Sequence, residues 1–169
     1  MEERKNKLRK RVSSLIVLFI VGLVLSGVTA FPIEKELAIA NSNISSFPEF
    51  LQHWISDVYF AVKTTNKNYP YLSYGTDWLA FAHLVIAVAF IGPLRDPVKN
   101  IWVIQFGMIS CIMIFPLAFI AGPIRGIPFY WQIIDSSFGV FGFALLYLCY
   151  TTILKLESAQ KFASIKSIT

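Results

Sequence analysis

Four stretches of the chain contain no charged residue and are long enough to cross a bilayer. They are Val12–Ile33, Trp78–Leu94, Ile101–Ile124 and Ser136–Leu154. A helix of about 17–25 mostly apolar residues spans a hydrocarbon core of roughly 30 Å. We therefore predict an all-α integral membrane protein with four transmembrane helices, over residues 12–31, 77–94, 97–121 and 135–154.

The segment between the first two spans, residues 32–76, is the only sizeable polar part of the chain. Its sequence Ser46-Phe47-Pro48-Glu49 is typical of a helix start. Apolar residues then recur at three- or four-residue steps, at Phe47, Leu51, Trp54, Val58 and Val62. We predict one extracytoplasmic amphipathic helix here, lying on the outer leaflet or covering the end of the bundle. Its other face carries residues four apart that fit either a solvated surface or a set of ligand side chains, namely Glu49, His53 and Asp57.

An aspartate stands at the start of each of the last three spans, at Asp77, Asp96 and Asp135. A carboxylate at this position accepts hydrogen bonds from free backbone N–H groups and complements the positive end of the helix dipole. We predict that all three aspartates cap their helices. The tyrosine-rich residues 68–77 are predicted to form turns before the second span.

The composition agrees with a membrane protein. Apolar residues make up 56% of the chain and charged residues 15%, against about 45–50% and 25% in soluble domains. These values exclude an ordinary soluble core, a disordered chain and a disulfide scaffold. The two cysteines, Cys111 and Cys149, fall at different depths of antiparallel spans, so we predict that they pack as small apolar residues and form no disulfide.

The positive charges indicate the orientation of the chain. All but four of the fifteen Lys and Arg residues lie in the tail 1–11, in the loop between the second and third spans, or in the tail 155–169. By the positive-inside rule these parts, both termini included, face the cytoplasm. A nucleic-acid-binding protein would carry its basic residues among aromatic ones on a soluble face. We therefore expect no nucleic-acid partner, and the bilayer itself is the partner that the composition implies.

The first span also permits a second interpretation. Its basic start, apolar centre and Val28-Thr29-Ala30 are typical of a signal peptide with a small-x-small cleavage site. The apolar character continues through Ile33, which favours a retained anchor. Cleavage would leave three spans and an N-terminus outside.

His83 is predicted to lie inside the second span, where an ionisable side chain costs free energy because the bilayer core does not solvate it. Asp77, Arg125 and Asp135 are expected at the same outer end of the bundle. His83 beside an aspartate could relay a proton or polarise a bound headgroup, or it could be a neutral imidazole hydrogen-bonded between helices. Arg125 could bridge Asp77 and Asp135 through its planar guanidinium. We predict a binding or structural polar cluster of these four residues.

No motif in the sequence identifies a catalytic or metal centre. HExxH, P-loop, GxSxG and CxxC patterns are absent, and one intramembrane histidine cannot provide a bis-histidine haem. We predict no catalytic residues, no metal ligands and no cofactor. The fourth span does carry small residues on one face, where another helix could approach closely, at Ser136, Gly139 and Gly142.

Three segments resemble a family of small bacterial inner-membrane proteins of uncharacterised function. They are YGTDWLAFAH (74–83), IGPLRDPVKNIWVI (91–104) and GPIRGIPFYW (122–131), and TAFPIE (29–34) is also similar. The resemblance implies a multi-pass protein of the bacterial cytoplasmic membrane and a retained first span. It implies no activity.

The sequence favours a non-enzymatic membrane accessory or assembly component that acts through helix–helix contacts, with a membrane-protein partner or a second copy of the chain. One alternative is a membrane enzyme or lipid-headgroup binder that uses the polar cluster around His83. Another is an oligomeric transporter subunit. A polar cleft open at the outer face beside His83 would favour the headgroup binder, and a closed, fully packed outer end would favour the accessory component.

Overall fold

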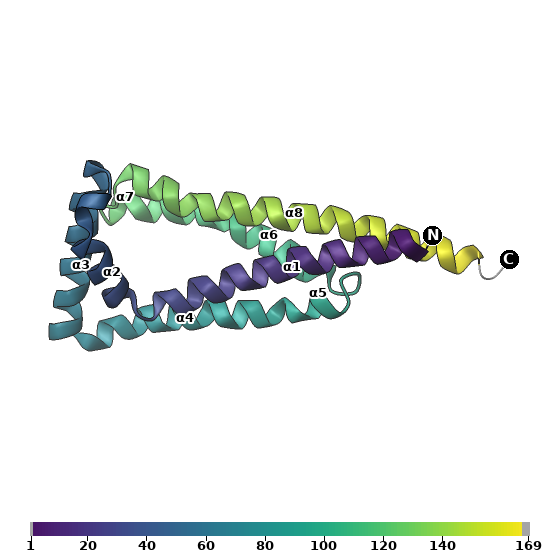
Figure 1. Cartoon of the computed structure of the whole chain (residues 1–169), viewed down its shortest axis with the longest axis horizontal. Coiled ribbons are helices and arrows are strands. Elements are labelled where there is room, and N and C mark those ends of the chain that lie inside the picture. Colours follow the sequence, from purple (N-terminus) through teal and green to yellow (C-terminus); the bar gives the residue numbers. More distant parts are fainter. Residues whose placement is uncertain (1, 167–169) are drawn as a thin grey trace. The chain divides into compact units, whose positions relative to one another are not determined.

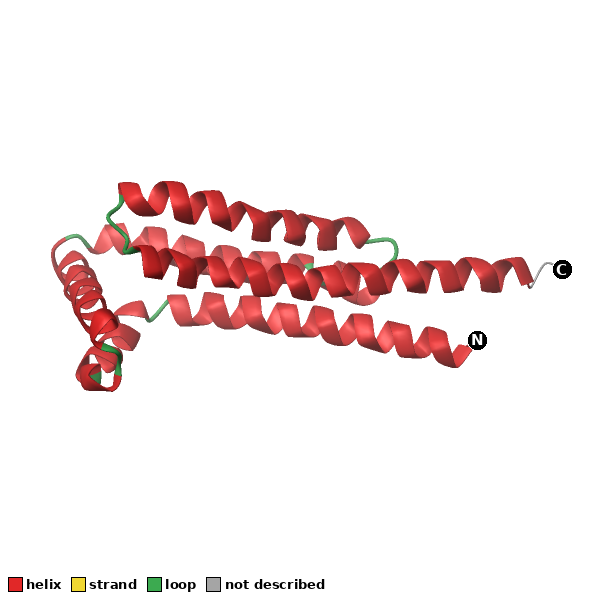
Figure 2. Cartoon of the chain, turned by 90° about the horizontal axis from the view of Figure 1, so that it is seen from above, coloured by secondary structure: helices red, strands yellow, loops and turns green. Residues whose placement is uncertain are grey.

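All regular structure in residues 2–166, the part of the chain that the computed structural model describes, is helical (Figure 2). Four helical segments are long and apolar enough to cross a membrane: Glu2–Ala30, Pro70–Arg95, Ile101–Ile124 and Phe129–Lys161. This confirms the predicted all-helical architecture with four membrane-compatible helices. The elements, labelled in Figure 1, are α1 (Glu2–Ala30), α2 (Ile33–Ser42), the 3₁₀ turn η1 (Ile44–Ser46), α3 (Glu49–Asn68), α4 (Pro70–Ala89), α5 (Ile91–Arg95), α6 (Ile101–Pro116), the π-helical η2 (Leu117–Ala121), α7 (Gly122–Ile124) and α8 (Phe129–Lys166).

The chain divides into two compact units. The first, which we call the α6–α8 unit, comprises the N-terminal residues through Val21 together with the chain from Val88 onward. The second, the α2–α4 unit, comprises Gly22–Ala87. Each unit is described by itself.

Two of the predicted aspartate caps are wrong. Helix α4 begins at Pro70 and α8 begins at Phe129, so Asp77 and Asp135 lie inside helices. The turns predicted for residues 68–77 are largely absent as well, because α4 runs through them. Proline needs no N–H partner in the first turn of a helix, and Pro70 stands at that position. The helices thus continue past the ends of the apolar runs.

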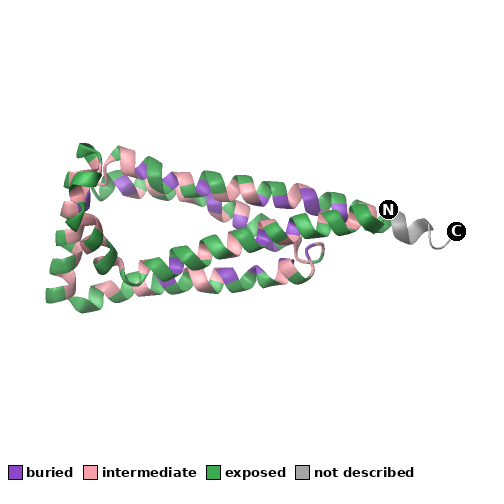
Figure 3. Cartoon of the chain, viewed as in Figure 1, coloured by how far each residue is buried: buried purple, intermediate pink, exposed green. Residues whose placement is uncertain are grey.

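In the α6–α8 unit, α6 packs along α8 through buried residues spaced three or four positions apart (Figure 3). They are Val103, Ile104, Gly107 and Cys111 on α6, and Leu146, Cys149, Ile153 and Leu156 on α8. Both cysteines are free and buried, as predicted. The small-residue face of α8 is used within the chain. A Cβ atom added at Gly139 would lie 2.7 Å from the carbonyl oxygen of Cys111, so the two helix backbones are in direct contact there.

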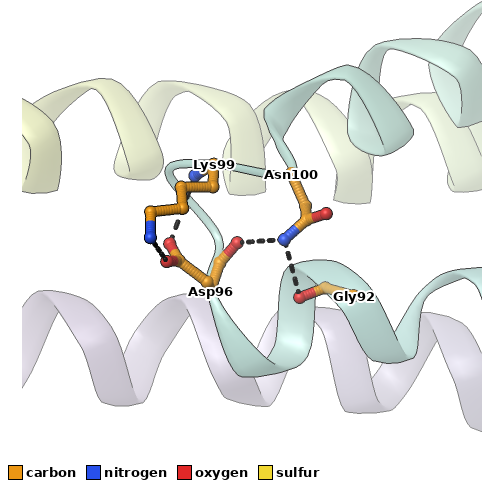
Figure 4. A network of polar contacts seen from close by, with 4 residues as sticks. All are labelled: Gly92, Asp96, Lys99 and Asn100. Carbon is orange, nitrogen blue, oxygen red and sulfur yellow. Dashed lines mark hydrogen bonds and ion pairs between the residues drawn. The ribbon is translucent and has the colours of Figure 1, made fainter.

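The connection between α5 and α6 is held by the Asn100 side chain (Figure 4). Its Nδ2 donates to the carbonyl oxygens of Gly92, at 3.2 Å, and of Asp96, at 2.9 Å. The Asp96 carboxylate accepts the backbone N–H of Lys99 at 3.2 Å, and its second oxygen lies 3.6 Å from Lys99 Nζ. Asp96 therefore does accept a backbone hydrogen bond, but in the turn that precedes α6.

We expect Asn100→Ala to destabilise the protein more than Lys99→Ala. The alanine at 100 removes two hydrogen bonds that satisfy carbonyls at a helix end, each worth about 0.5–1.5 kcal/mol. The Lys99–Asp96 pair is exposed, and such pairs contribute about 0–1 kcal/mol. Thermal unfolding of both variants in one detergent measures the difference. A Lys99→Ala variant that melts at or below the temperature of Asn100→Ala would contradict this account of the turn.

In the α2–α4 unit, side-chain hydrogen bonds link three successive helices. The Ser56 hydroxyl on α3 donates to Asn41 Oδ1 on α2 at 2.8 Å. Asn66 Nδ2 on α3 donates to Glu34 Oε2 on α2 at 2.5 Å, and the Ser73 hydroxyl on α4 donates to Asn66 Oδ1. Asn66 thus connects α2 with α4.

Helix α3 covers the region where the sequence predicts a helix. Leu51, Trp54, Val58 and Val62 are half-buried on it and Ile55 is buried, whereas Glu49, His53 and Asp57 are all exposed. Its place on the outer leaflet stays a prediction.

Candidate functional site

The end of α6 is reshaped by Pro116. Proline has no backbone N–H to donate to the preceding turn, and the helix widens into the π-helical turn η2 immediately after it. Such turns interrupt regular α-helix and often occur at functional sites. Here η2 places Leu117, Ala118 and Ala121 on the wall of a groove beside α8.

The chain then reverses through a helix stop built around Gly126. The Ile127 N–H donates to the Gly122 carbonyl at 3.0 Å, and the Gly126 N–H donates to the Pro123 carbonyl at 3.1 Å. This pair of bonds is the Schellman arrangement, which requires a left-handed residue after the helix. Gly126 provides it with a φ of +70°. Arg125 directly precedes this turn, so the helix stop fixes where its side chain leaves the backbone.

Gln132 on α8 packs into the space left by Gly122. A Cβ atom at Gly122 would lie 2.8 Å from Gln132 Cδ, so only glycine lets the amide approach the backbone of α7 this closely. The Gln132 side chain is 4% exposed, and its Nε2 donates to the Ile127 carbonyl at 2.8 Å. Its Oε1 is buried, and no residue within 2–166 donates a hydrogen bond to it.

This unpartnered oxygen is energetically costly. A buried acceptor without a donor costs about 1–3 kcal/mol, and native proteins contain few of them. The opposite amide orientation would place Oε1 against the Ile127 carbonyl, where neither atom can donate. The hydrogen bond of Nε2 therefore fixes Oε1 as the group that requires a donor.

Gln132 lines an open groove of about 330 Å³ together with two of the predicted cluster residues, Arg125 and Asp135. The rest of the lining is apolar, and it runs from the helix stop back through α7 and η2 to the last turn of α6: Ile127, Gly122, Ala121, Ala118, Leu117 and Ile114. Arg125 and Asp135 are both exposed. The groove thus has a mostly apolar lining that includes one cationic and one anionic side chain.

The predicted bridge between Arg125 and Asp135 is not formed. In the part of the chain that the structure describes, no ion pair joins the two side chains. Each charge in the groove is therefore available to another group.

Asp77 and His83 belong to the α2–α4 unit. Asp77 is half-buried and lines a second pocket, of about 320 Å³, with Glu34, Lys35, Asn66, Ser73 and Thr76. His83 is half-buried, with its Nδ1 2.8 Å from the Leu79 carbonyl of the same helix, and it lies beside Gly27 of α1. It does not line the pocket of Asp77. Two of the four predicted cluster residues therefore lie in each unit. That all four form one cluster stays a prediction.

Among the described residues, no group of three His, Cys, Asp or Glu side chains could hold a metal ion. The spacing of Glu49, His53 and Asp57 on α3 therefore does not produce a metal site within that range.

Gln132 is the site residue that the sequence reasoning missed. It is a lone amide between Trp131 and Ile133 at the start of an apolar helix, and a polar group in that position is expensive without a partner. That signal could have identified it. The close packing against Gly122 has no such signal, because Gly122-Pro123 reads equally well as an ordinary helix stop.

Comparison of the chain with protein-family models, with curated proteins and with solved structures finds no match.

Proposed function

We propose that this chain is a non-enzymatic integral membrane component that binds a phospholipid in the groove between the end of α6 and the start of α8. The observation that carries the proposal is the lining of this groove, which is mostly apolar and includes the exposed side chain of Arg125. A phospholipid likewise combines apolar chains with a charged phosphate. Its acyl chains match the side chains of Ile114 and Leu117, and its phosphate matches the guanidinium of Arg125, which binds phosphate oxygens in a planar fork.

The size of the groove limits how much of the lipid it holds. Pockets that enclose a small molecule measure about 300–1,000 Å³, so about 330 Å³ accepts a headgroup and the first part of an acyl chain. The remaining chain would lie against the exposed apolar side chains of α6, such as Ile109 and Met113. We therefore infer a bound lipid that keeps contact with the bilayer.

The small residues on one face of α8 suggested a binding partner that is itself a helix. We propose a lipid as the partner instead, because this face is already in use. That face contacts α6 through Gly139, and Ser136 on it is buried. It is thus occupied within the α6–α8 unit. The groove presents Arg125 and Asp135, which form no ion pair with each other in the described chain.

We further propose a location in a bacterial cytoplasmic membrane, with both termini inside and the groove at the outer surface. The asymmetry of Lys and Arg supports the orientation, and the three resembling sequence segments support the bacterial membrane. In this arrangement Arg125 lies at the level of the outer headgroups.

Cysteine labelling checks this orientation. Lys63 and Lys99 are both exposed, so a cysteine at either position is accessible to reagent on its own side of the membrane. In a Cys111→Ala, Cys149→Ala background, we expect an impermeant maleimide to label Lys63→Cys in intact cells and Lys99→Cys only after lysis. Labelling of Lys99→Cys in intact cells would overturn the orientation.

The lipid-binding function is tested with Arg125→Ala. We expect the parent protein, purified in mild detergent, to retain phospholipid that native mass spectrometry detects. The variant should retain about tenfold less, which corresponds to the loss of one hydrogen bond to a charged group.

Arg95→Ala is the matched control, because Arg95 is also an exposed arginine near a helix end but lies outside the groove. It should retain as much lipid as the parent. Equal retention by the Arg125→Ala and Arg95→Ala variants would rule out lipid binding through Arg125.

A further inference from the structure

We infer that the start of α1 forms a separate site for phospholipids whose headgroup carries a net negative charge. The site is an open hollow of about 550 Å³ on α1, which we call the basic hollow. It is lined by Asn6, Arg9, Lys10, Ser13 and Ser14. None of these residues lines the groove beside α8, so the inference stands apart from the function proposed above.

The basic hollow lies where the charged start of α1 gives way to its apolar part. Its side chains follow one another at steps of three and four positions, so they are neighbours on one helix face. Arg9 and Lys10 end the charged part of this face, and Ser13 and Ser14 already belong to the stretch without charge, residues 12–33.

The length of α1 places the basic hollow at the level of lipid headgroups. At about 1.5 Å per residue, the part of α1 from residue 12 to residue 30 is about 28 Å long. A hydrocarbon core of roughly 30 Å matches that length. With this part in the core, Arg9 and Lys10 stand within one helical turn of its edge, where the phosphates of the lipids lie.

The lining of the basic hollow offers positive charge and hydrogen-bond donors, and it contains no acidic side chain. Arg9 and Lys10 are exposed, and neither belongs to an ion pair within residues 2–166. The Ser110 hydroxyl of α6 donates to the carbonyl four residues earlier, but no hydrogen bond in the same range uses the hydroxyls of Ser13 and Ser14. Both kinds of group bind phosphate oxygens.

This lining favours a net negative headgroup over a zwitterionic one. A phosphate is attracted by both cations. The ammonium group of a zwitterionic headgroup would meet two like charges and no carboxylate in the lining. Glu2 and Glu3 are the acidic residues that precede the hollow in α1, and both are at least about 9 Å from Arg9 along the helix.

The same face of α1 continues as an apolar surface, which favours a lipid over a soluble anion. Val17, Leu18 and Val21 follow the two serines at steps of three and four residues, and all three are exposed. A lipid with its phosphate in the basic hollow can lay an acyl chain along these side chains. A soluble phosphate would leave them uncovered.

The test compares phosphatidylglycerol with phosphatidylcholine, both with dioleoyl chains. Each is titrated into delipidated full-length protein in detergent, and binding is measured by native mass spectrometry. All proteins carry Arg125→Ala, so that lipid held through Arg125 in the groove does not contribute. We expect phosphatidylglycerol to bind at least about tenfold more tightly, because each Lys or Arg near a lipid surface contributes about fivefold. Equal binding of the two lipids would overturn the inference.

A pair of double variants separates the basic hollow from the charge of the tail as a whole. Arg9→Gln with Lys10→Gln should weaken phosphatidylglycerol binding about 25-fold and leave phosphatidylcholine binding unchanged. Arg4→Gln with Arg11→Gln removes the same charge from two exposed residues outside the hollow. Because Arg11 directly follows Lys10, it points to another side of the helix. This control should lose much less affinity, and an equal loss would overturn the site.

A neutral variant and a soluble competitor complete the test. Ser13→Ala with Ser14→Ala changes no charge and should weaken phosphatidylglycerol binding about fivefold through lost hydrogen bonds. Unchanged binding would overturn the assignment of the phosphate to the basic hollow. Inorganic phosphate at the concentration of the lipid should not displace it, and displacement would show that the hollow binds a soluble anion instead.

Discussion

Replacing Gly139 with leucine is expected to force α6 and α8 apart and to cause the largest loss of stability in the α6–α8 unit. Even a Cβ atom at this position would lie 2.7 Å from the Cys111 carbonyl oxygen and 3.4 Å from Phe115. The atom in the way belongs to a helix backbone, so no side-chain rotation can relieve the clash. We expect a cost at or above about 3 kcal/mol, the upper range for overpacked cores. That cost corresponds to a fall of about 10 °C in the melting temperature.

Gly22→Leu is the matched control for this substitution. Gly22 is also a helical glycine, and a Cβ atom there would meet no other atom within 4 Å. The same side chain should therefore change the melting temperature little, or raise it slightly, since leucine favours helix more than glycine. Thermal unfolding of both variants in one detergent makes the comparison. If Gly139→Leu melts with Gly22→Leu, the close contact between α6 and α8 is wrong.

In the α2–α4 unit, Gly27→Leu is expected to have the second largest effect. A Cβ atom at Gly27 would lie 2.8 Å from the Ala80 carbonyl oxygen and 3.1 Å from Leu84 Cδ2. Helices α1 and α4 are therefore in backbone contact at this point, and Ala80 is fully buried. We expect a loss of roughly 3 kcal/mol, measured as faster amide hydrogen exchange in α4 around residues 79–84.

Gly75→Leu on α4 provides the comparison within the same unit. A Cβ atom at Gly75 has nothing within 4 Å, so the amides of α4 should exchange as slowly as in the parent. Faster exchange in Gly75→Leu than in Gly27→Leu would show that α4 is held by other contacts.

The helical architecture could be predicted because it depends on properties that single residues carry. Stretches such as Ile101–Ile124 have no charge, and only a helix satisfies their backbone groups within one segment in a membrane. The prediction failed where a hydropathy boundary was taken for a helix boundary. Backbone hydrogen bonds continue through polar residues, so α4 extends back to Pro70 and α8 to Phe129. Pro70 itself was the available signal, since proline is favoured in the first turn of a helix.

The candidate site could be predicted only in part. Arg125 and Asp135 were identified because charges near apolar spans are rare and costly, and both line the groove. Gln132 joins them through its packing against Gly122, a contact between residues on different helices. The distance from Arg125 to the two residues of α8 depends on the π-helical turn after Pro116 and on the reversal of the chain at Gly126. The spacing of residues in the sequence does not fix that distance. The sequence therefore indicated which groups carry charge, and the structure gave their arrangement within each unit.

Helix α8 is 38 residues long, which at about 1.5 Å per residue gives a rod of roughly 57 Å. A hydrocarbon core of roughly 30 Å takes up little more than half of that length. If Phe129 lies at one membrane surface, the rod leaves the core on the other side before Lys155. It continues through Glu157 and Lys161, whose side chains pair at 2.7 Å. These charges would then stand at a height above that membrane surface that the helix itself sets, so a molecule that meets them would be held at a defined distance from the bilayer.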